Sequence, residues 1–301
     1  MDQYVRQADA FASLFLGKRD RRDYRGARDG CAPSPSGRRY RTVFVSDVHL
    51  GTRGCKAEAL AAFLASTPCD KLFLVGDIID GWRLKRRWYW PEAHTAVLHE
   101  ILRKVDGGTR VVYVPGNHDE AFRDFCGRSL AGIEIAREAV HETVDGKRLL
   151  VVHGDQFDGV IACAKWLAHL ADWAYTLVLR LSDAHDAMRR RFGLPYWSLS
   201  AYLKRKVKNA VEYVCHFKDA VAREAATRGF DGVVCGHIHH AAVDQVSGIL
   251  YCNDGDWVES CTALVENASG ALRIIHWPLF SNEDLPGQRN QWLPAAAPLA
   301  A

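Results

Sequence analysis

The sequence predicts an α/β fold, in which short buried strands alternate with helices. Residues 42–45, 71–75 and 110–114 are runs of β-branched, aromatic and aliphatic side chains, and such runs are typical of strands covered on both faces. Predicted helices at 57–66 and about 92–105 separate them, which favours helices layered on a sheet. The 301 residues, 48% of them hydrophobic, are enough to bury the core of such a domain.

Further strands are predicted at 149–152, 232–235 and 249–252, but the helical segment 158–228 interrupts the alternation. One predicted helix in it has an apolar residue at every third or fourth position, and a second, about 200–226, is apolar on one side and basic on the other. The apolar positions are Trp166, Leu170, Trp173, Leu177 and Leu181, then Leu203, Val207, Val211, Val214 and Phe217. We expect an insertion that packs over one face of the core.

The two ends of the chain differ in composition from its middle. Residues 1–41 predict a basic flexible leader, because the stretch from 17 onwards is charged and rich in Gly, Pro and Ser. Residues 284–301 are rich in Pro and Ala, which predicts a flexible tail. The expected organisation is this leader, one domain over 42–283 with the insertion at 158–228, and the tail.

Charge and cysteine content exclude several classes of protein. A formal net charge of +3 is too small to predict a nucleic-acid partner. The nine cysteines include no C-x-x-C pair, which favours buried free thiols in a reducing compartment over a disulfide framework or a zinc cluster. No signal peptide and no run of about 18 uncharged residues is visible, so we expect a cytoplasmic protein, with attachment to a membrane surface left open.

Five short polar blocks come directly after predicted strands. They are Ser46-Asp47-Val48-His49, Gly76-Asp77-Ile78-Ile79-Asp80, Gly116-Asn117-His118-Asp119, His153-Gly154-Asp155 and Gly236-His237-Ile238-His239. Since ligands of open α/β sheets bind outside the carboxyl ends of the strands, we expect these blocks to meet in one crevice. A strand-end Asp alone is often a helix N-cap and a lone His is often structural, but five blocks in this context favour a shared site.

The blocks bring two Asp, one Asn and four His to the crevice as candidate metal ligands. This mixture of oxygen and nitrogen, without cysteine, suits a catalytic Mn, Fe or Zn site. In the D-x-H and H-x-H spacings, alternate residues of an extended segment would face the same way, and neighbouring glycines would let the backbone approach closely. Asp77 lies centrally, where one carboxylate can bridge two cations that together activate hydroxide for an in-line displacement.

These blocks resemble the pattern of the calcineurin-like metallophosphoesterase superfamily, D-x-H, G-D-x-x-D, G-N-H-D/E, a lone H and G-H-x-H, over about residues 42–277. The resemblance implies a four-layer sandwich of two mixed β-sheets flanked by helices. It also implies two divalent metal ions, with Mn as the first choice and Fe or Zn as alternatives. One ion would bind Asp47, His49, Asp77 and His239, and the other Asp77, Asn117, His153 and His237. His118 would polarise the phosphoryl group or protonate the leaving oxygen, oriented by Asp119.

Within the superfamily the chain is similar to the UDP-2,3-diacylglucosamine diphosphatase group of lipid A biosynthesis, which shares the motif order and the helical insertion. The resemblance implies a nucleotide-linked lipid substrate, a lid over its acyl chains, and action at the inner face of the cytoplasmic membrane. Candidate substrate contacts are Asp158, Lys204, Lys206 and Lys208. The alternatives are a solvated face for these side chains and an internal core for the apolar stripe of the insertion.

Two features leave other functions open. The best-known diphosphatases of the group carry Arg at the position of His118, so a phosphodiesterase or phosphatase for another phosphoester is the second hypothesis. A scaffold that keeps the fold without catalysis is the third, although every ligand position is intact. The basic and aromatic segment 82–90 fits either a membrane interface or a nucleotide, and packing beneath the lid would explain its aromatic residues equally well.

Overall fold

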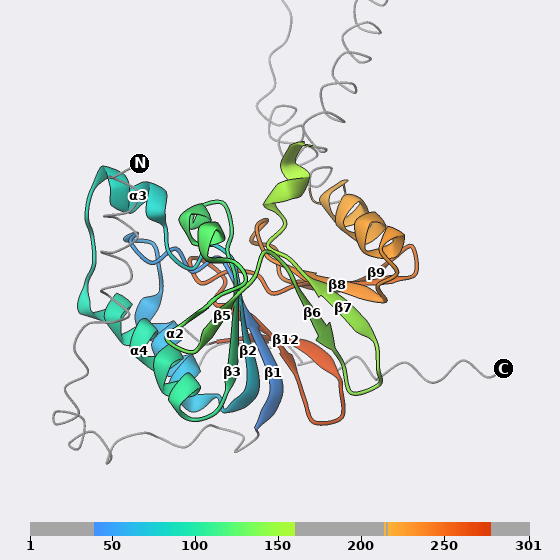
Figure 1. Ribbon diagram of the computed structural model, residues 1–301, viewed down its shortest axis with the longest axis horizontal. Helices are drawn as coiled ribbons and strands as arrows, with labels where there is room; N and C mark the ends of the chain where they lie inside the picture. The colour runs from blue at the N-terminus through green and yellow to red at the C-terminus, as the bar shows by residue number, and fades with distance from the viewer. Residues whose placement is uncertain (1–38, 160–213, 215, 278–301) are drawn as a thin grey trace, which may run out of the picture.

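The computed structural model describes residues 39–159, 214 and 216–277. Most of the predicted leader, of the insertion and all of the tail lie outside these residues, as do Lys204, Lys206 and Lys208. Twelve strands form two mixed sheets in the described part. Helices cover the outer sides of both sheets (Figure 1), which confirms the predicted fold class.

The first sheet has seven strands in the order β12-β11-β1-β2-β3-β5-β4. Their bounds are β1 (Tyr40–Val45), β2 (Cys69–Val75), β3 (Arg110–Val114), β4 (Ser129–Leu130), β5 (Ile133–Ile135), β11 (Thr262–Glu266) and β12 (Leu272–His276). Strands β1, β2, β3 and β5 run parallel, and β4, β11 and β12 are antiparallel to their neighbours. The parallel strands direct their carboxyl ends to one edge of the sheet.

The second sheet has the order β6-β7-β8-β10-β9. Its strands are β6 (Ala139–Glu142), β7 (Arg148–Val151), β8 (Gly232–Cys235), β9 (Ala242–Val246) and β10 (Ile249–Asn253). Here β7, β8 and β10 are parallel, and the two edge strands are antiparallel. The strands predicted at 149–152, 232–235 and 249–252 are thereby confirmed to within one residue.

Helices α2 (Ala57–Ser66) and α4 (Glu92–Asp106) pack on the outer face of the first sheet, and a helix over residues 216–227 packs on that of the second (Figure 1). Three apolar clusters separate the resulting layers. Val43 and Val45 of β1 face α2 and α4, whereas Phe44 between them packs against the second sheet. Phe217 packs with Leu150 on the far side. The alternation along each strand thus produces the four layers.

Strand β1 begins at Tyr40, two residues before the predicted start. Tyr40 is buried, pairs with Cys69 of β2, and its N–H donates to the Pro68 carbonyl at 2.9 Å. All six cysteines in the described part are free and five are buried, as predicted for that part of the chain. Among the described residues, none of the helices has the length and apolar composition needed to cross a bilayer.

A buried polar network joins the two sheets around Glu266 of β11. The Glu266 carboxylate accepts hydrogen bonds from Thr42 at 3.0 Å and from the Val144 N–H at 3.1 Å, and it lies 3.1 Å from Arg41 and 2.8 Å from His141 of β6. Burial raises the pKa of Glu266, but His141 and then Arg41 more than offset this and hold it below its ordinary value of 4.5. The network therefore stabilises the contact between the sheets when Glu266 is ionised.

We predict that Glu266→Ala lowers the free energy of unfolding by about 3–5 kcal/mol, because it leaves buried donors without their partner. In the parent chain, the stability that Glu266 contributes should be fully present above the pKa that Glu266 has in the unfolded chain. It should be lost as the pH falls through the depressed pKa of Glu266 in the folded chain. Urea denaturation at neutral and acidic pH measures both effects. The matched control is Glu134→Ala, an exposed partner of Arg110 that should cost less than about 1 kcal/mol. Equal losses for the two variants would contradict the prediction.

Candidate metal centre

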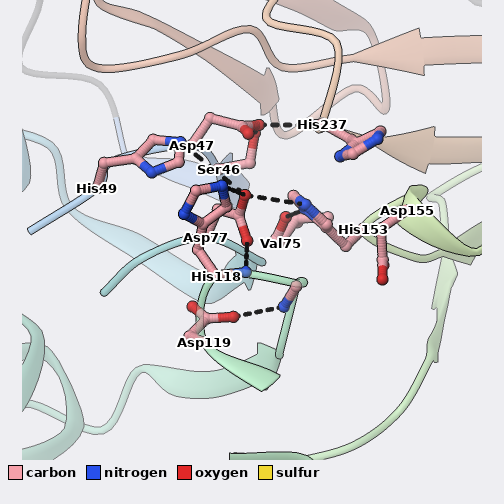
Figure 2. A network of polar contacts seen from close by, with 12 residues as sticks. Ser46, Asp47, His49, Val75, Asp77, His118, Asp119, His153, Asp155 and His237 are labelled. Carbon is pink, nitrogen blue, oxygen red and sulfur yellow. Dashed lines mark hydrogen bonds and ion pairs between the residues drawn. The ribbon is translucent and has the colours of Figure 1, made fainter. Parts of the chain in front are cut away.

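The five polar blocks follow β1, β2, β3, β7 and β8. Because β1, β2 and β3 are parallel neighbours, and β7 and β8 are too, the blocks meet at the carboxyl ends of the two sheets. Figure 2 shows the side chains of Asp47, His49, Asp77, His118 and His153 directed toward a common region. The strand-end blocks therefore converge on one region, as predicted.

Five of the seven candidate ligands have a left-handed backbone. Asp47, His49, Asp77, His237 and His239 have φ angles of 50°, 55°, 54°, 69° and 52°. The predicted explanation of the D-x-H and H-x-H spacings, alternation along an extended segment, is therefore wrong. Left-handed backbone costs an ordinary residue about 1–2 kcal/mol, and such strain is typical of functional sites. Here it turns these five residues out of the strand direction.

Glycines give the ligands the space they occupy. A Cβ on Gly116 would lie 2.3 Å from Asp77 Oδ1, and one on Gly236 would lie 2.4 Å from Asp47 Oδ2. A Cβ on Gly76, which has a φ of +80°, would lie 2.3 Å from the His153 ring. The predicted close approach of backbone to ligands is confirmed at these three glycines.

Asp77 lies at the centre of the cluster. Its Oδ2 is 3.4 Å from His153 Nε2, 3.9 Å from His49 Nε2 and 4.0 Å from His118 Nε2. Asp47 Oδ1 lies 3.2 Å from His239 Nε2, and the rings of His49 and His239 stack. Three sets have ligand atoms within 4.8 Å of one another: Asp47 with His49 and His239, Asp47 with Asp77 and His153, and His49 with Asp77 and His118. These sets are compact enough to bind cations, and Asp77 belongs to two of them.

Several buried polar atoms in this cluster have no hydrogen-bond partner. They include Asp47 Oδ1, Asn117 Oδ1 and His153 Nε2. A buried polar atom without a partner costs about 1–3 kcal/mol, whereas bound cations would satisfy all three atoms. Their residue types, carboxylate, amide and imidazole, suit Mn, Fe or Zn. The donor set therefore fits divalent metal ions.

The charges of the cluster also favour cations. Burial raises the pKa of Asp47 and of Asp77, but histidine neighbours lower both below their ordinary value, so both carboxylates stay ionised. Burial lowers the pKa of His153, yet Asp77 and Asp47 raise it to about 10. This negative field would attract a metal ion in place of the proton.

His118 contacts Asp80, which corrects the predicted role of Asp119. His118 Nδ1 lies 3.2 Å from Asp80 Oδ1, and this carboxylate holds the pKa of His118 above its usual value although burial acts in the opposite direction. Asp119 instead accepts hydrogen bonds from the N–H groups of Gly116 at 2.5 Å and Ile78 at 2.7 Å. Its oxygens thus connect the ligand-bearing loop after β2 to the loop after β3. Asp80 was visible in the sequence as the last residue of G-D-x-x-D but received no predicted role.

Asn117 and His237 lie beside the cluster in different ways. Asn117 follows β3, and its Oδ1 is buried. The His237 ring packs 5.1 Å from that of His153, while its Nε2 lies 2.9 Å from Asp158 Oδ1. Asp158, predicted as a substrate contact, thus pairs with a predicted metal ligand. Asp155 forms an ion pair with Arg123 at 2.7 Å and points away from the cluster in Figure 2.

The model of the calcineurin-like phosphoesterase family matches residues 40–241, which include all five blocks. The chain belongs to this family. It is thus a metal-dependent phosphohydrolase of a family that uses two metal ions. The UDP-2,3-diacylglucosamine hydrolase of Neisseria meningitidis serogroup A is 31% identical over 77% of this chain and 96% of its own length.

Two further proteins are similar to the chain. The UDP-2,3-diacylglucosamine hydrolase of Neisseria gonorrhoeae is 25% identical over 77% of this chain and 97% of its own. Among solved structures, the phosphoesterase Yfce from E. coli is 17% identical, with a TM-score of 0.38 over 78% of this chain and 92% of that one.

Proposed function

We propose that this phosphohydrolase cleaves the phosphoanhydride of a nucleotide-linked lipid diphosphate of the UDP-2,3-diacylglucosamine type, in lipid A biosynthesis. The observation that carries the proposal is the match to UDP-2,3-diacylglucosamine hydrolases over nearly their whole length. The cluster around Asp77 supports the chemistry, because it gathers the ligands that hydrolysis of a phosphoanhydride needs.

In this proposal, Asp47, His49, Asp77 and His239 hold one metal ion, and Asp77, Asn117, His153 and His237 hold the other. When bound, the two ions supply activated hydroxide and neutralise phosphate charge. Asp80 lies against His118 Nδ1 and favours the protonated imidazole, which would donate to the phosphoryl or leaving oxygen. Asp119 keeps the two ligand loops together.

The surface of α3 (Gly81–Arg86) and the residues after it support docking on an anionic membrane. Arg83, Arg86 and Arg87 are exposed and form no ion pair within the described residues, whereas Arg39, Arg110 and Arg228 pair with carboxylates. The indoles of Trp82 and Trp88 are 43% and 60% exposed, and the Trp82 ring packs 4.2 Å from that of His118. Cations beside exposed indoles are typical of a membrane interface, and this surface adjoins the catalytic cluster.

The substrate proposal predicts hydrolysis of UDP-2,3-diacylglucosamine by the full chain loaded with Mn²⁺, Fe²⁺ or Zn²⁺. Cleavage of the phosphoanhydride releases UMP and a lipid sugar phosphate in equal amounts, and chromatography with phosphorus detection measures both. Bis(p-nitrophenyl) phosphate serves as the second substrate. Turnover of this diester alone would favour a phosphodiesterase, the alternative that His118 in place of Arg supports. Absence of turnover on every phosphoester at full metal occupancy would favour the hypothesis of a scaffold that keeps the fold without catalysis.

The membrane proposal predicts that the chain co-sediments with phosphatidylglycerol vesicles and not with phosphatidylcholine vesicles. The triple variant Arg83→Gln, Arg86→Gln and Arg87→Gln should bind the anionic vesicles about 100-fold more weakly, since each cation near such a surface contributes about 1 kcal/mol. The matched control removes three paired cations, Arg103→Gln, Arg110→Gln and Arg228→Gln. Equal weakening by both triple variants would show a non-specific charge effect and contradict the assigned surface.

A further inference from the structure

A second buried carboxyl group, that of Asp254, lies behind Asp47. Asp254 directly follows β10 and is fully buried. The hydroxyl of Ser46 joins the two acids, since its Oγ lies 2.6 Å from Asp47 Oδ2 and 2.6 Å from Asp254 Oδ1. Neither Asp254 nor Ser46 belongs to the proposed metal ligands.

Counting protons shows how Asp47, Ser46 and Asp254 are hydrogen-bonded to one another. Ser46 has one hydroxyl proton, but each of its two contacts with a carboxyl oxygen is short enough to require a proton between the oxygens. The Gly255 carbonyl, at 3.2 Å, is a poorer acceptor for the hydroxyl. One of the two acids must therefore carry a proton of its own.

Asp254 is the acid that carries it. Asp47 Oδ2 also accepts a hydrogen bond from the backbone N–H of His237 at 2.8 Å, and Oδ1 lies beside the His239 ring, so the surroundings of Asp47 stabilise its anion. Asp254 has no ion pair with a basic side chain in the described part of the chain, and its Oδ2 has no hydrogen-bond partner. Burial raises the pKa of Asp254 well above its ordinary value, which agrees with this assignment.

The surrounding backbone leaves Ser46 and Asp254 little freedom to rearrange. A Cβ on Gly236 would lie 2.3 Å from Ser46 Oγ, so the hydroxyl packs tightly against the loop after β8. Asn253 donates to the Gly236 carbonyl at 2.7 Å and accepts the N–H of Gly255 at 3.0 Å, which fixes the loop that carries Asp254. The two 2.6 Å contacts are thus held by the fold.

We propose that Asp254 is a positioning residue, a neutral carboxylic acid that donates a hydrogen bond to Ser46, whose hydroxyl in turn donates to Asp47 and orients it for metal binding. The inference rests on the metal ligands proposed above. A neutral Asp254 also avoids a further negative charge in the buried surroundings of Asp47 and Asp77. Groups that orient metal ligands in this way fix both the direction and the basicity of the ligand.

The test is calorimetric titration of the metal-free full chain with Mn²⁺, together with infrared spectroscopy at neutral pH. We expect Asp254→Ala and Ser46→Ala to weaken Mn²⁺ binding by about 10- to 100-fold, and Asp254→Asn, whose amide can donate to Ser46 as the acid does, to restore it. The infrared difference between the parent chain and Asp254→Asn should show the C=O band of a protonated carboxyl group. Ser66→Ala, which removes a hydroxyl bonded to the Ala62 carbonyl far from the cluster, is the matched control.

Bound Mn²⁺ without the protonated-carboxyl band would overturn this inference alone, as would equal weakening by Asp254→Asn and Asp254→Ala. No Mn²⁺ binding by the parent chain would overturn the proposed metal ligands and the inference with them. Should Asp254→Ala fail to fold, Ser46→Ala and the infrared band still decide the matter. None of these measurements uses a phosphoester, so a wrong substrate proposal would leave them unchanged and would show only in the turnover assays.

Discussion

Replacing Asp77 by Ala is expected to abolish measurable phosphohydrolase activity and to weaken Mn²⁺ binding by more than about 100-fold, the upper end of what residues outside the ligand set cost. The reason is its central position, with Oδ2 facing His153 at 3.4 Å and His49 at 3.9 Å. A carboxylate at this position would hold both cations, so its loss would weaken the binding of both. Metal content after dialysis and turnover of bis(p-nitrophenyl) phosphate measure the two effects.

A second variant separates the charge of Asp77 from its place in the fold. Asp77 Oδ1 accepts the N–H of His118 at 2.9 Å, and the amide oxygen of Asp77→Asn can accept the same hydrogen bond. We therefore expect Asp77→Asn to keep the loop geometry and still lose metal. Asp145→Asn, which removes an acid paired with Lys147 in the turn between β6 and β7, is the control that should retain activity. Turnover unchanged in Asp77→Ala would refute the bridging carboxylate.

The sequence was sufficient to predict that the candidate site residues follow buried strands, because strand ends can be recognised from local patterns. The buried runs before Asp47, Asp77 and Asn117 are strands in the structure, and parallel pairing directs their carboxyl ends to one edge. Strand β11 was not predicted, although it is fully buried beside β1. Its pairing with β1 joins residues more than 200 positions apart, a contact that no local pattern encodes, whereas its other partner, β12, follows it directly in the chain.

Side-chain partners were harder to predict than ligand positions. The family resemblance implied that Asp119, which follows His118 directly, orients the imidazole, but neighbours in a loop point in different directions. Asp80 reaches the ring because β2 and β3 are adjacent, which brings residues 38 positions apart together. The left-handed backbone of His49 and His239 was equally hidden, since nothing in their residue type demands a positive φ.

His118→Asn is expected to lower kcat by about 10²- to 10⁴-fold, the usual contribution of a general acid or base, while the chain binds Mn²⁺ as before. His118 is part of the cluster through Asp77 Oδ2 at 4.0 Å, but its Nδ1 contacts Asp80, so we expect its task to be holding a proton. Turnover at saturating substrate and metal content by mass spectrometry measure the two quantities separately. The control is His99→Asn, an exposed histidine on α4.

The contact between His118 and Asp80 predicts how substitutions of these two residues combine in the same measurements. In the parent chain, Asp80 Oδ1 accepts a hydrogen bond from the Arg83 backbone N–H at 2.8 Å and so caps α3, and the amide oxygen of Asp80→Asn can accept the same bond. The substitution removes the charge that favours a protonated His118. If Asp80 acts through His118, its substitution costs activity in the parent chain and little more once His118 is Asn, because residues that act as a unit are not additive. Fully additive losses would mean that Asp80 acts independently of the imidazole. Loss of metal from His118→Asn would instead make His118 a ligand, in line with its place beside His49 and Asp77.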